Sequence, residues 1–293
     1  MNWRRGLKAK VNKGEPLKNK TSFKIGGEAR FFSSVRNENE LKELIVASRR
    51  YKIPVFILGA GSNILVSDRG VGGLVIKLNS RVFKKVTFNK NLVTVGSGAT
   101  LSEVIRKASA LGLSGLEFLV GIPGTMGGAI IMNAGAWGKD IGNIIEKVKV
   151  MDYRGEVKFL DRGKIKFGYR DSGLGSYVIL GAVLRLCRDR RANILRRIKE
   201  NLDLRRNTQD NTKPNAGCVF KNPAGMSAGK LIDLCGLKGK SSGGAAVSLR
   251  HANFILNKRN ARSRDVLKLM DLIRAKVKRD FDIELKPEIK IWQ

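Results

Sequence analysis

The stretch GIPGTMGGAIIMNAGAWG, residues 121–138, carries six glycines in eighteen positions and constrains the fold more than any other feature of the chain. Glycine inside a helix or strand is destabilising by roughly 0.5–1 kcal/mol relative to alanine. So many glycines are expected where bare main chain packs against something flat or phosphorylated. The stretch therefore predicts a ligand-binding loop.

A second glycine loop, LGAGSNILVSD, follows the short apolar run IPVFILG, which is typical of a buried strand. Gly59 and Gly61 let main chain approach a diphosphate closely, and clustered N–H groups form an anion site. The loop lacks the GK[ST] of a Walker motif, and a strand-like run follows Gly61 where a dinucleotide-binding motif has a helix. A tight turn between strands is the alternative. Together the two loops suggest one extended cofactor with a diphosphate and a ring.

The chain carries 57 Lys and Arg against 25 Asp and Glu, a formal net charge of +32. Such an excess attracts polyanions, including nucleic acid, and equally suits a cleft for anionic small molecules. Aromatic residues make up only 6% of the chain, and no RRM, zinc-finger or helix-turn-helix pattern accompanies the charge. Nucleic-acid binding is therefore the weaker hypothesis.

The three cysteines, Cys187, Cys218 and Cys235, and the one histidine, His251, exclude most metal chemistry. Their spacing matches no zinc pattern, and an odd number of cysteines suits a reducing cytosol. Cys187 and Cys235 lie in apolar runs, so we expect both to fill the core. Cys218 lies between Gly217 and a basic, amide-rich stretch, where a core position fits less well.

The first twenty residues carry charge but no apolar segment of the kind found in secretory signals. No run of about 18 apolar residues, the length needed to span a bilayer, occurs in the sequence. We therefore expect a cytoplasmic protein without membrane insertion.

Helical and strand-like periodicities both occur and predict a mixed fold. The predicted helices cover 38–51, 100–112, 227–237 and 263–281. The second opens with a capping box of Thr100 and Glu103 and closes at Gly112. Residues 146–160 predict a hairpin turning at Arg154–Gly155, and the basic segment 188–206 predicts a helix or linker at a domain boundary.

The last predicted helix carries one apolar stripe, formed by Val266, Leu269, Ile273 and Val277. This stripe favours a core-facing helix over one that lies on a membrane surface. The following segment, DIELKPEIKIW, alternates apolar and charged residues, which predicts a strand with Glu288 on its polar face. By pattern alone, that carboxylate is a solvated surface group.

Six motifs follow one another in the chain: TSFKIGG, LGAGSNILVSD, LEFLVGIPGTMGGAIIMNAGAWG, FGYRDS, AGCVFKNP and the closing PEI. In this order they resemble the UDP-N-acetylenolpyruvoylglucosamine reductases, also called UDP-N-acetylmuramate dehydrogenases, from about residue 20 to the end. The short distance from Tyr169–Arg170 to Cys218 resembles the compact branch of that family, which lacks an extra tyrosine-bearing loop.

The resemblance implies an α+β chain, with a two-subdomain FAD-binding fold of the vanillyl-alcohol-oxidase type and a C-terminal α+β substrate-binding domain. It implies a first FAD-binding subdomain at 1–80, completed by a strand at 283–293, a second at 81–200, and a substrate domain at 201–282. Neither glycine loop contains histidine, so FAD is expected to bind non-covalently.

The resemblance also implies which residues form the sites. FAD is expected to contact both glycine loops, at Gly59, Ala60, Gly61, Ser62, Asn63, Gly121, Pro123, Gly124, Thr125, Gly127, Gly128, Asn133, Ala134 and Gly135. The substrate is expected to contact Tyr169, Lys221 and Asn222, with Arg205 or Arg206 at its diphosphate.

The implied reaction is the NADPH-dependent reduction of UDP-N-acetylglucosamine enolpyruvate to UDP-N-acetylmuramate, in peptidoglycan precursor synthesis. Negative charge develops beside the substrate carboxylate, so hydrogen-bond donors are needed there. Arg170 is expected to bind the carboxylate through two donors, and a protonated Glu288 to donate to the same oxygens. By pattern alone, Arg170 is a surface partner of Asp171.

Cys218 stands where most of the family has a serine that donates a proton to the substrate carbanion. A thiol with an ordinary pKa near 8.5 is mainly protonated at pH 7 and is a competent acid. Basic neighbours such as Lys221 or Arg170 would lower that pKa and favour an unreactive thiolate. We interpret Cys218 as the proton donor.

Two other functions stay open at this point. One is a flavin-dependent sugar or lactone oxidase of the same fold, which has no reason to share the YRDS, AGCVFKNP and PEI motifs. The other is a nucleic-acid-binding protein on an inactive flavoenzyme scaffold, suggested by the +32 charge. The sequence does not indicate an oligomeric state.

Overall fold

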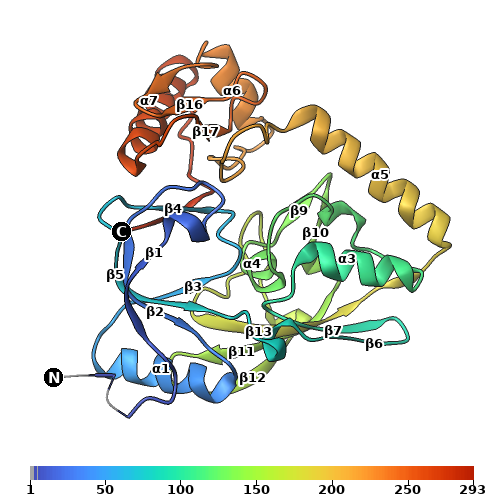
Figure 1. Ribbon diagram of the computed structural model, residues 1–293. Helices are drawn as coiled ribbons and strands as arrows, with labels where there is room; N and C mark the ends of the chain where they lie inside the picture. The colour runs from blue at the N-terminus through green and yellow to red at the C-terminus, as the bar shows by residue number, and fades with distance from the viewer. Residues whose placement is uncertain (1–2, 5) are drawn as a thin grey trace. The chain divides into compact units, whose positions relative to one another are not determined.

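The computed structural model describes residues 3, 4 and 6–293 (Figure 1). The chain divides into two compact units, each assembled from three separate segments. Unit 1 is formed by Met1–Lys13, Phe31–Ala60 and Gly73–Leu204, and unit 2 by Gly14–Arg30, Gly61–Gly72 and Arg205–Gln293. The three-part division expected from the resemblance stays a prediction.

Unit 1 contains a five-stranded antiparallel sheet in the order β12-β11-β13-β7-β6 (Figure 1). Its strands are β6 (Val86–Asn89), β7 (Leu92–Gly96), β11 (Ile145–Asp152), β12 (Val157–Asp161) and β13 (Tyr177–Arg185). Apolar residues of the sheet form one core with helices α3 (Leu101–Ala110) and α4 (Met126–Ile131), and a second with α1 (Glu38–Arg50). The sheet therefore buries side chains in two separate cores.

A four-stranded sheet has the order β1-β2-β5-β3, and the chain passes between the two units within β1, β2 and β5. Its strands are β1 (Asn12–Pro16), β2 (Glu28–Ser34), β3 (Val55–Leu58) and β5 (Val71–Lys77). In unit 1, β3 pairs with β5 in parallel, with Val55 opposite Leu74. This pairing orients the end of β3, and with it Gly59, the start of the first glycine loop.

Several short elements complete unit 1: α2 (Arg81–Lys84), β8 (Leu113–Ser114), η2 (Glu117–Leu119), β9 (Gly135–Ala136), β10 (Lys139–Asp140), η3 (Ile141–Asn143), η4 (Arg162–Lys164) and β14 (Cys187–Arg188). Of these, β9 and β10 form a small hairpin, and β14 pairs with β8. The η labels mark single turns of 3₁₀-helix.

Unit 2 packs α6 (Ala228–Leu234) and α7 (Ser263–Phe281) with a three-stranded sheet of β15 (Ser241–Ser242), β16 (Ala245–Val247) and β17 (Ile255–Asn257). The apolar stripe of α7 is at most 1% exposed and belongs to this core, so the prediction of a core-facing helix is confirmed. A separate parallel pair joins β4 (Ile64–Val66) to β18 (Lys290–Trp292), and η1 covers Lys18–Lys20.

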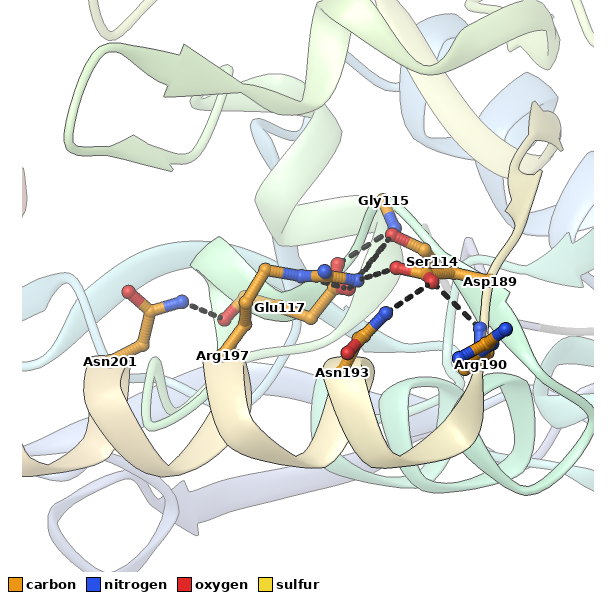
Figure 2. Close-up of polar contacts among 8 residues, drawn as sticks. All are labelled: Ser114, Gly115, Glu117, Asp189, Arg190, Asn193, Arg197 and Asn201. Atoms are coloured by element: carbon orange, nitrogen blue, oxygen red, sulfur yellow. Dashed lines mark hydrogen bonds and ion pairs between the residues drawn. The ribbon is translucent and has the colours of Figure 1, made fainter.

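The basic segment predicted as a helix or linker is the helix α5 (Arg191–Thr208), which enters unit 2 at Arg205. The part of α5 that belongs to unit 1 is joined to the rest of that unit by the polar cluster of Figure 2. There Arg197 donates to Glu117 at 2.9 Å and to Asp189 at 2.6 Å, while Asn201 donates to the main-chain oxygen of Glu117 at 3.0 Å. Beside the cluster, Ile194 is 1% exposed.

Burial opposes ionisation of Glu117, but hydrogen bonds from main-chain N–H groups, Arg197 and Ser114 outweigh it and lower the pKa. Asp189 accepts hydrogen bonds from Asn193 and Arg197, which lower its pKa from 3.8 to about 2. Both carboxylates are therefore ionised at neutral pH, and α5 is held to unit 1 by charge-assisted hydrogen bonds.

The predicted hairpin turn is confirmed, and of the predicted capping box only the half made by Thr100 is confirmed. Thr100 Oγ1 accepts from Glu103 N at 3.3 Å, and α3 ends before Gly112, whose φ is +66°. The Glu103 carboxylate binds Lys107 at 2.8 Å. The hairpin turn at Arg154–Gly155 lies between paired strands β11 and β12.

Two other predictions are wrong. Cys187 is exposed, because Leu186 occupies the buried face and strand alternation turns Cys187 outward. The tail forms a strand only over Lys290–Trp292, although burial still alternates, with Leu285 and Ile289 buried. Cys235 is buried as expected. No helix among the described residues has the length and apolar character needed to cross a bilayer.

Candidate cofactor and substrate sites

The two glycine loops touch each other in unit 1. Gly59 follows β3 directly, and a Cβ added to it would lie 2.7 Å from Thr125 Oγ1. That distance is shorter than real side-chain contacts, so a side chain at residue 59 would push the loops apart. Glycine at this position therefore keeps two stretches of main chain adjacent.

The second loop contains the short helix α4, which the high glycine content did not predict. Thr125 begins the helix, its hydroxyl accepting from Gly128 N at 3.4 Å. Gly127 approaches the end of β7 so closely that a Cβ on it would lie 2.9 Å from Ser97 Cβ. Gly127 is needed because this side of the helix packs tightly, while Met126 and Ile130 are buried in the core.

The residues present fit an extended flavin nucleotide. Ala60, Gly121 and Pro123 are exposed, and the other loop glycines of unit 1 before Asn133 are half-buried, so main chain is accessible along both loops. Within the described part of the chain, the buried hydroxyl of Ser97 finds no hydrogen-bond partner, and Ser97 Cβ would lie 2.9 Å from a Cβ added to Gly127. Accessible main chain beside a buried polar group is what a cofactor with phosphates and a flat ring requires.

Arg170 lies in a turn at residues 168–171 and contacts the C-terminal end of the second loop. Its Nη1 donates to the main-chain oxygen of Gly135 at 3.0 Å, and its guanidinium carbon lies 5.3 Å from the centroid of the Tyr169 ring. The Tyr169 side chain is 54% exposed, so it is available to cover a ligand. Asp171 accepts from Gly173 N at 3.0 Å.

Unit 2 brings two predicted catalytic residues onto neighbouring extended segments. Glu288 N donates to Val219 O at 2.8 Å, and Phe220 forms an antiparallel bridge with Pro287. Cys218 is therefore one residue from the position opposite Glu288. On its other side, Cys218 forms an antiparallel bridge with Phe254. Cys218 and Glu288 are both half-buried, as acid–base groups that meet a ligand need to be.

Asn253 holds this arrangement and was not singled out from the sequence. Its side chain is 2% exposed, accepts from Phe220 N at 2.9 Å and donates to Phe220 O at 2.8 Å. The available signal was an asparagine in the apolar run HANFIL, because a buried amide is tolerated only when it is hydrogen-bonded.

The rest of the first loop lies in unit 2. Gly61 has φ +70°, and a Cβ there would lie 2.2 Å from Lys20 O. Asn63 donates to Glu288 O at 3.2 Å, and Lys290 N donates to Asn63 O at 2.9 Å. These bonds hold the Glu288 segment beside the loop that precedes β4.

The predicted substrate-binding residues of unit 2 are also accounted for. Lys221 is half-buried, and its N–H donates to Lys286 O at 2.9 Å. Asn222 is exposed, and its Oδ1 accepts from Ala228 N at 3.0 Å, at the start of α6. Arg205 is buried and Arg206 exposed near the end of α5.

Comparison with known proteins covers nearly the whole chain. Residues 29–161 match an FAD binding domain, and residues 209–292 match the C-terminal domain of UDP-N-acetylenolpyruvoylglucosamine reductase. The reductase 2 of that name from Symbiobacterium thermophilum is 43% identical over 97% of this chain and 92% of its own length. The reductase of Caldanaerobacter subterraneus is 43% identical over 96% and 93%. The chain belongs to the UDP-N-acetylenolpyruvoylglucosamine reductase family.

The structure agrees with this assignment. The crystal structure of the reductase from Thermus caldophilus matches with a TM-score of 0.82 and 36% identity, over 98% of this chain and 99% of that one. A solvent-stable cholesterol oxidase matches 63% of this chain and 39% of its own with a TM-score of 0.51 and 14% identity, which shows the shared fold alone. The predicted fold class, an FAD-binding fold of the vanillyl-alcohol-oxidase type plus a C-terminal domain, is confirmed.

UDP-N-acetylenolpyruvoylglucosamine reductases are FAD-dependent oxidoreductases that use NADPH in peptidoglycan synthesis. The prediction of a flavoenzyme of this class is therefore confirmed, and the oxidase hypothesis is set aside. The comparisons identify the family, while the roles of individual catalytic residues stay predictions from the resemblance.

Proposed function

We propose that this chain reduces the enolpyruvyl group of UDP-N-acetylglucosamine enolpyruvate, with Arg170, Cys218 and Glu288 as its catalytic residues. The observation that supports this most is the pairing in unit 2, where Glu288 N donates to Val219 O at 2.8 Å, next to Cys218. Both side chains belong to motifs of the family. Their half-buried positions allow contact with a ligand while limiting access of water.

FAD is held, in this proposal, by the main chain of the fourteen glycine-loop residues, without a covalent bond. Bound FAD supplies the chemistry that takes hydride from NADPH and passes it to the terminal carbon of the substrate double bond. The close approach of Gly59 to Thr125 keeps the two loops of unit 1 adjacent. In unit 2, the positive φ of Gly61 lets the rest of the first loop pass close to Lys20. Tyr169, Lys221 and Asn222 contact the substrate, and Arg205 or Arg206 contacts its diphosphate.

Residues of the chain then stabilise the negative charge that develops on the substrate and supply the proton that completes the reduction. Arg170 donates to the substrate carboxylate, where charge accumulates as the adjacent carbon gains an electron pair. Glu288, protonated, donates to the same oxygens. Cys218 gives its proton to that carbon, forming the new C–H bond, and the resulting thiolate is reprotonated from water.

The small-molecule substrate is an anion, and a chain of net charge +32 favours its approach. We propose no obligate nucleic-acid partner and no membrane insertion. The odd number of cysteines fits a reducing compartment, which supports a cytoplasmic location.

A visible spectrum tests the function. The purified protein is expected to be yellow and to lose its visible flavin absorbance when NADPH is added. Absorbance is expected to return when the enolpyruvyl substrate is added without oxygen. A colourless protein after flavin reconstitution, or reduced protein that the substrate does not reoxidise, would contradict the proposal.

A further inference from the structure

Arg170 has an unusual backbone. Its φ is +55°, in the left-handed region that side chains other than glycine adopt only under constraint. It lies in a turn closed by two main-chain bonds, Gly168 N to Asp171 O at 2.8 Å and Asp171 N to Gly168 O at 3.3 Å. A strained residue persists only when its surroundings fix it, and such residues gather at functional sites.

One buried side chain holds that turn against the second glycine loop. Asn133 is 2% exposed, and its Nδ2 donates to Gly168 O at 2.9 Å. Its Oδ1 accepts from Gly142 N at 3.0 Å. Both ends of the amide are therefore satisfied inside unit 1. Asn133 itself has φ +41°, which asparagine tolerates better than most residues.

The same stretch of loop also fixes the other end of Arg170. The guanidinium Nη1 donates to Gly135 O at 3.0 Å, two residues beyond Asn133. One segment, 133–135, thus contacts the turn through a side-chain amide and the guanidinium through a carbonyl. Gly142, which donates to Asn133, is itself held by Arg162, whose Nε donates to Gly142 O at 2.7 Å.

We propose that Asn133 is a positioning residue for Arg170: its amide fixes the strained turn so that the guanidinium meets the substrate carboxylate in one orientation. The inference rests on the proposed function, because it gives Asn133 a role only if Arg170 acts on the substrate. It assigns the side chain of Asn133 to the turn, while its main chain stays part of the loop that holds FAD.

Two variants of the holoenzyme test this. Asn133→Asp keeps an acceptor for Gly142 N but replaces the donor to Gly168 O with an acceptor. Asn133→Gly removes both contacts and keeps the left-handed backbone relaxed, so it covers the case in which the aspartate fails to fold. Asn143→Asp is the matched control, since Asn143 lies next to Gly142 in η3 and its Oδ1 accepts from Asp140 N at 3.0 Å.

Stopped-flow separates the two half-reactions. In both Asn133 variants, reoxidation of the flavin by the substrate is expected to slow at least about tenfold more than its reduction by NADPH does. The control is expected to change neither rate more than about twofold. Parallel loss of flavin content and both rates, or an unchanged second half-reaction, would overturn the proposal.

A double-mutant cycle shows whether Asn133 acts through Arg170. In an Arg170→Ala background, Asn133→Gly is expected to cause almost no further loss, because the group it positions is gone. Additive losses would overturn the inference.

Hydrogen exchange gives a measurement that does not depend on turnover. The main-chain amides of Gly168 and Asp171 are expected to exchange faster in Asn133→Gly and not in Asn143→Asp. If the wild-type enzyme does not use the substrate, the proposed function fails instead.

Discussion

Cys218 stands where the family resemblance leads us to expect a serine. Cys218 forms a main-chain bridge with Phe254, and the next residue, Val219, accepts a hydrogen bond from Glu288 N. The backbone at Cys218 is therefore fixed, while the residue as a whole stays half-buried. A thiol and a hydroxyl of similar shape therefore find the same surroundings here. The proton they deliver differs in acidity by several pKa units, as a thiol ionises near 8.5.

Cys218→Ser is expected to retain substantial turnover, because either group supplies a proton from the same position. Cys218→Ala is expected to keep flavin reduction by NADPH and to lose most of the second half-reaction, about 10²-fold or more. Single-turnover stopped-flow measures both. Normal turnover of the alanine variant would rule out the proton-donor role, and equal loss in both half-reactions would indicate misfolding.

Gly61 carries a stability prediction. Its φ of +70° and the 2.2 Å from an added Cβ to Lys20 O leave no room for alanine. Gly61→Ala is expected to lower the free energy of unfolding by at least about 2 kcal/mol, from steric clash and backbone strain together. Gly72→Ala is the control, since nothing lies within 4 Å of a Cβ at that position. Urea titration followed by circular dichroism compares the two; equal stability would contradict the prediction.

Individual residues were predictable from the sequence only where a motif named them. Gly59 and Cys218 belong to recognisable motifs. The cofactor contact expected of Asn133 stays a prediction, and no motif indicated that its side chain joins two parts of unit 1. Asn253 was not noticed. Buried amides of this kind depend on which carbonyl and N–H groups the fold brings together, and no local pattern records that.

At the scale of elements, α5 depends on the cluster that attaches it. Arg197 is 31% exposed and contacts Glu117, whose side chain is 9% exposed. Removing Arg197 leaves a nearly buried carboxylate without its charged donor. The neighbouring pair on the same helix, Arg196 with Glu200, is 64% and 52% exposed and is well solvated.

Arg197→Met is therefore expected to cost about 2 kcal/mol of unfolding free energy at pH 7, as for a hydrogen bond to a charged group. Arg196→Met is expected to cost less than about 0.5 kcal/mol. Thermal unfolding of both variants at pH 7 checks the difference. Similar losses in both would show that burial of Glu117 does not matter.

The same cluster predicts a pH dependence. Depressed carboxylate pKa values stabilise the folded state above the unfolded pKa, and this contribution is lost as pH falls through the folded pKa. For Asp189 that window runs from 3.8 down to about 2. The advantage of the wild type over Arg197→Met is therefore expected to be constant from pH 7 to 5 and to shrink below about pH 4. A gap that widens in acid would contradict this.

Long periodic elements were predictable, and short ones were not. The helices α1, α3 and α7 follow from apolar spacing and capping residues, because those signals are local. The six-residue α4 was missed because it contains two glycines, of which Gly127 is required by its close approach to Ser97 rather than by helix propensity. The strand predicted for the C-terminal segment was too long, because only Lys290–Trp292 pairs with another strand, β4.

For the whole molecule, the net charge of +32 is the dominant long-range term. Like charges in excess repel one another and oppose the compact state, and salt weakens that repulsion. Raising ionic strength from about 0.01 M to about 0.15 M shortens the screening length from about 30 Å to about 8 Å. The midpoint of thermal unfolding is therefore expected to rise by several degrees. Equal rises in NaCl and KCl would indicate screening, and a flat or falling midpoint would contradict the prediction.

The distribution of unit 2 along the chain has a consequence for biosynthesis. The strand Ile64–Val66 is apolar and buried, but its partner is Lys290–Trp292. At translation rates of about 5–20 residues per second, an emerging polypeptide waits on the order of tens of seconds before that partner leaves the ribosome. During this interval an apolar strand edge is uncovered in the nascent chain, and it is a natural place for a chaperone to bind.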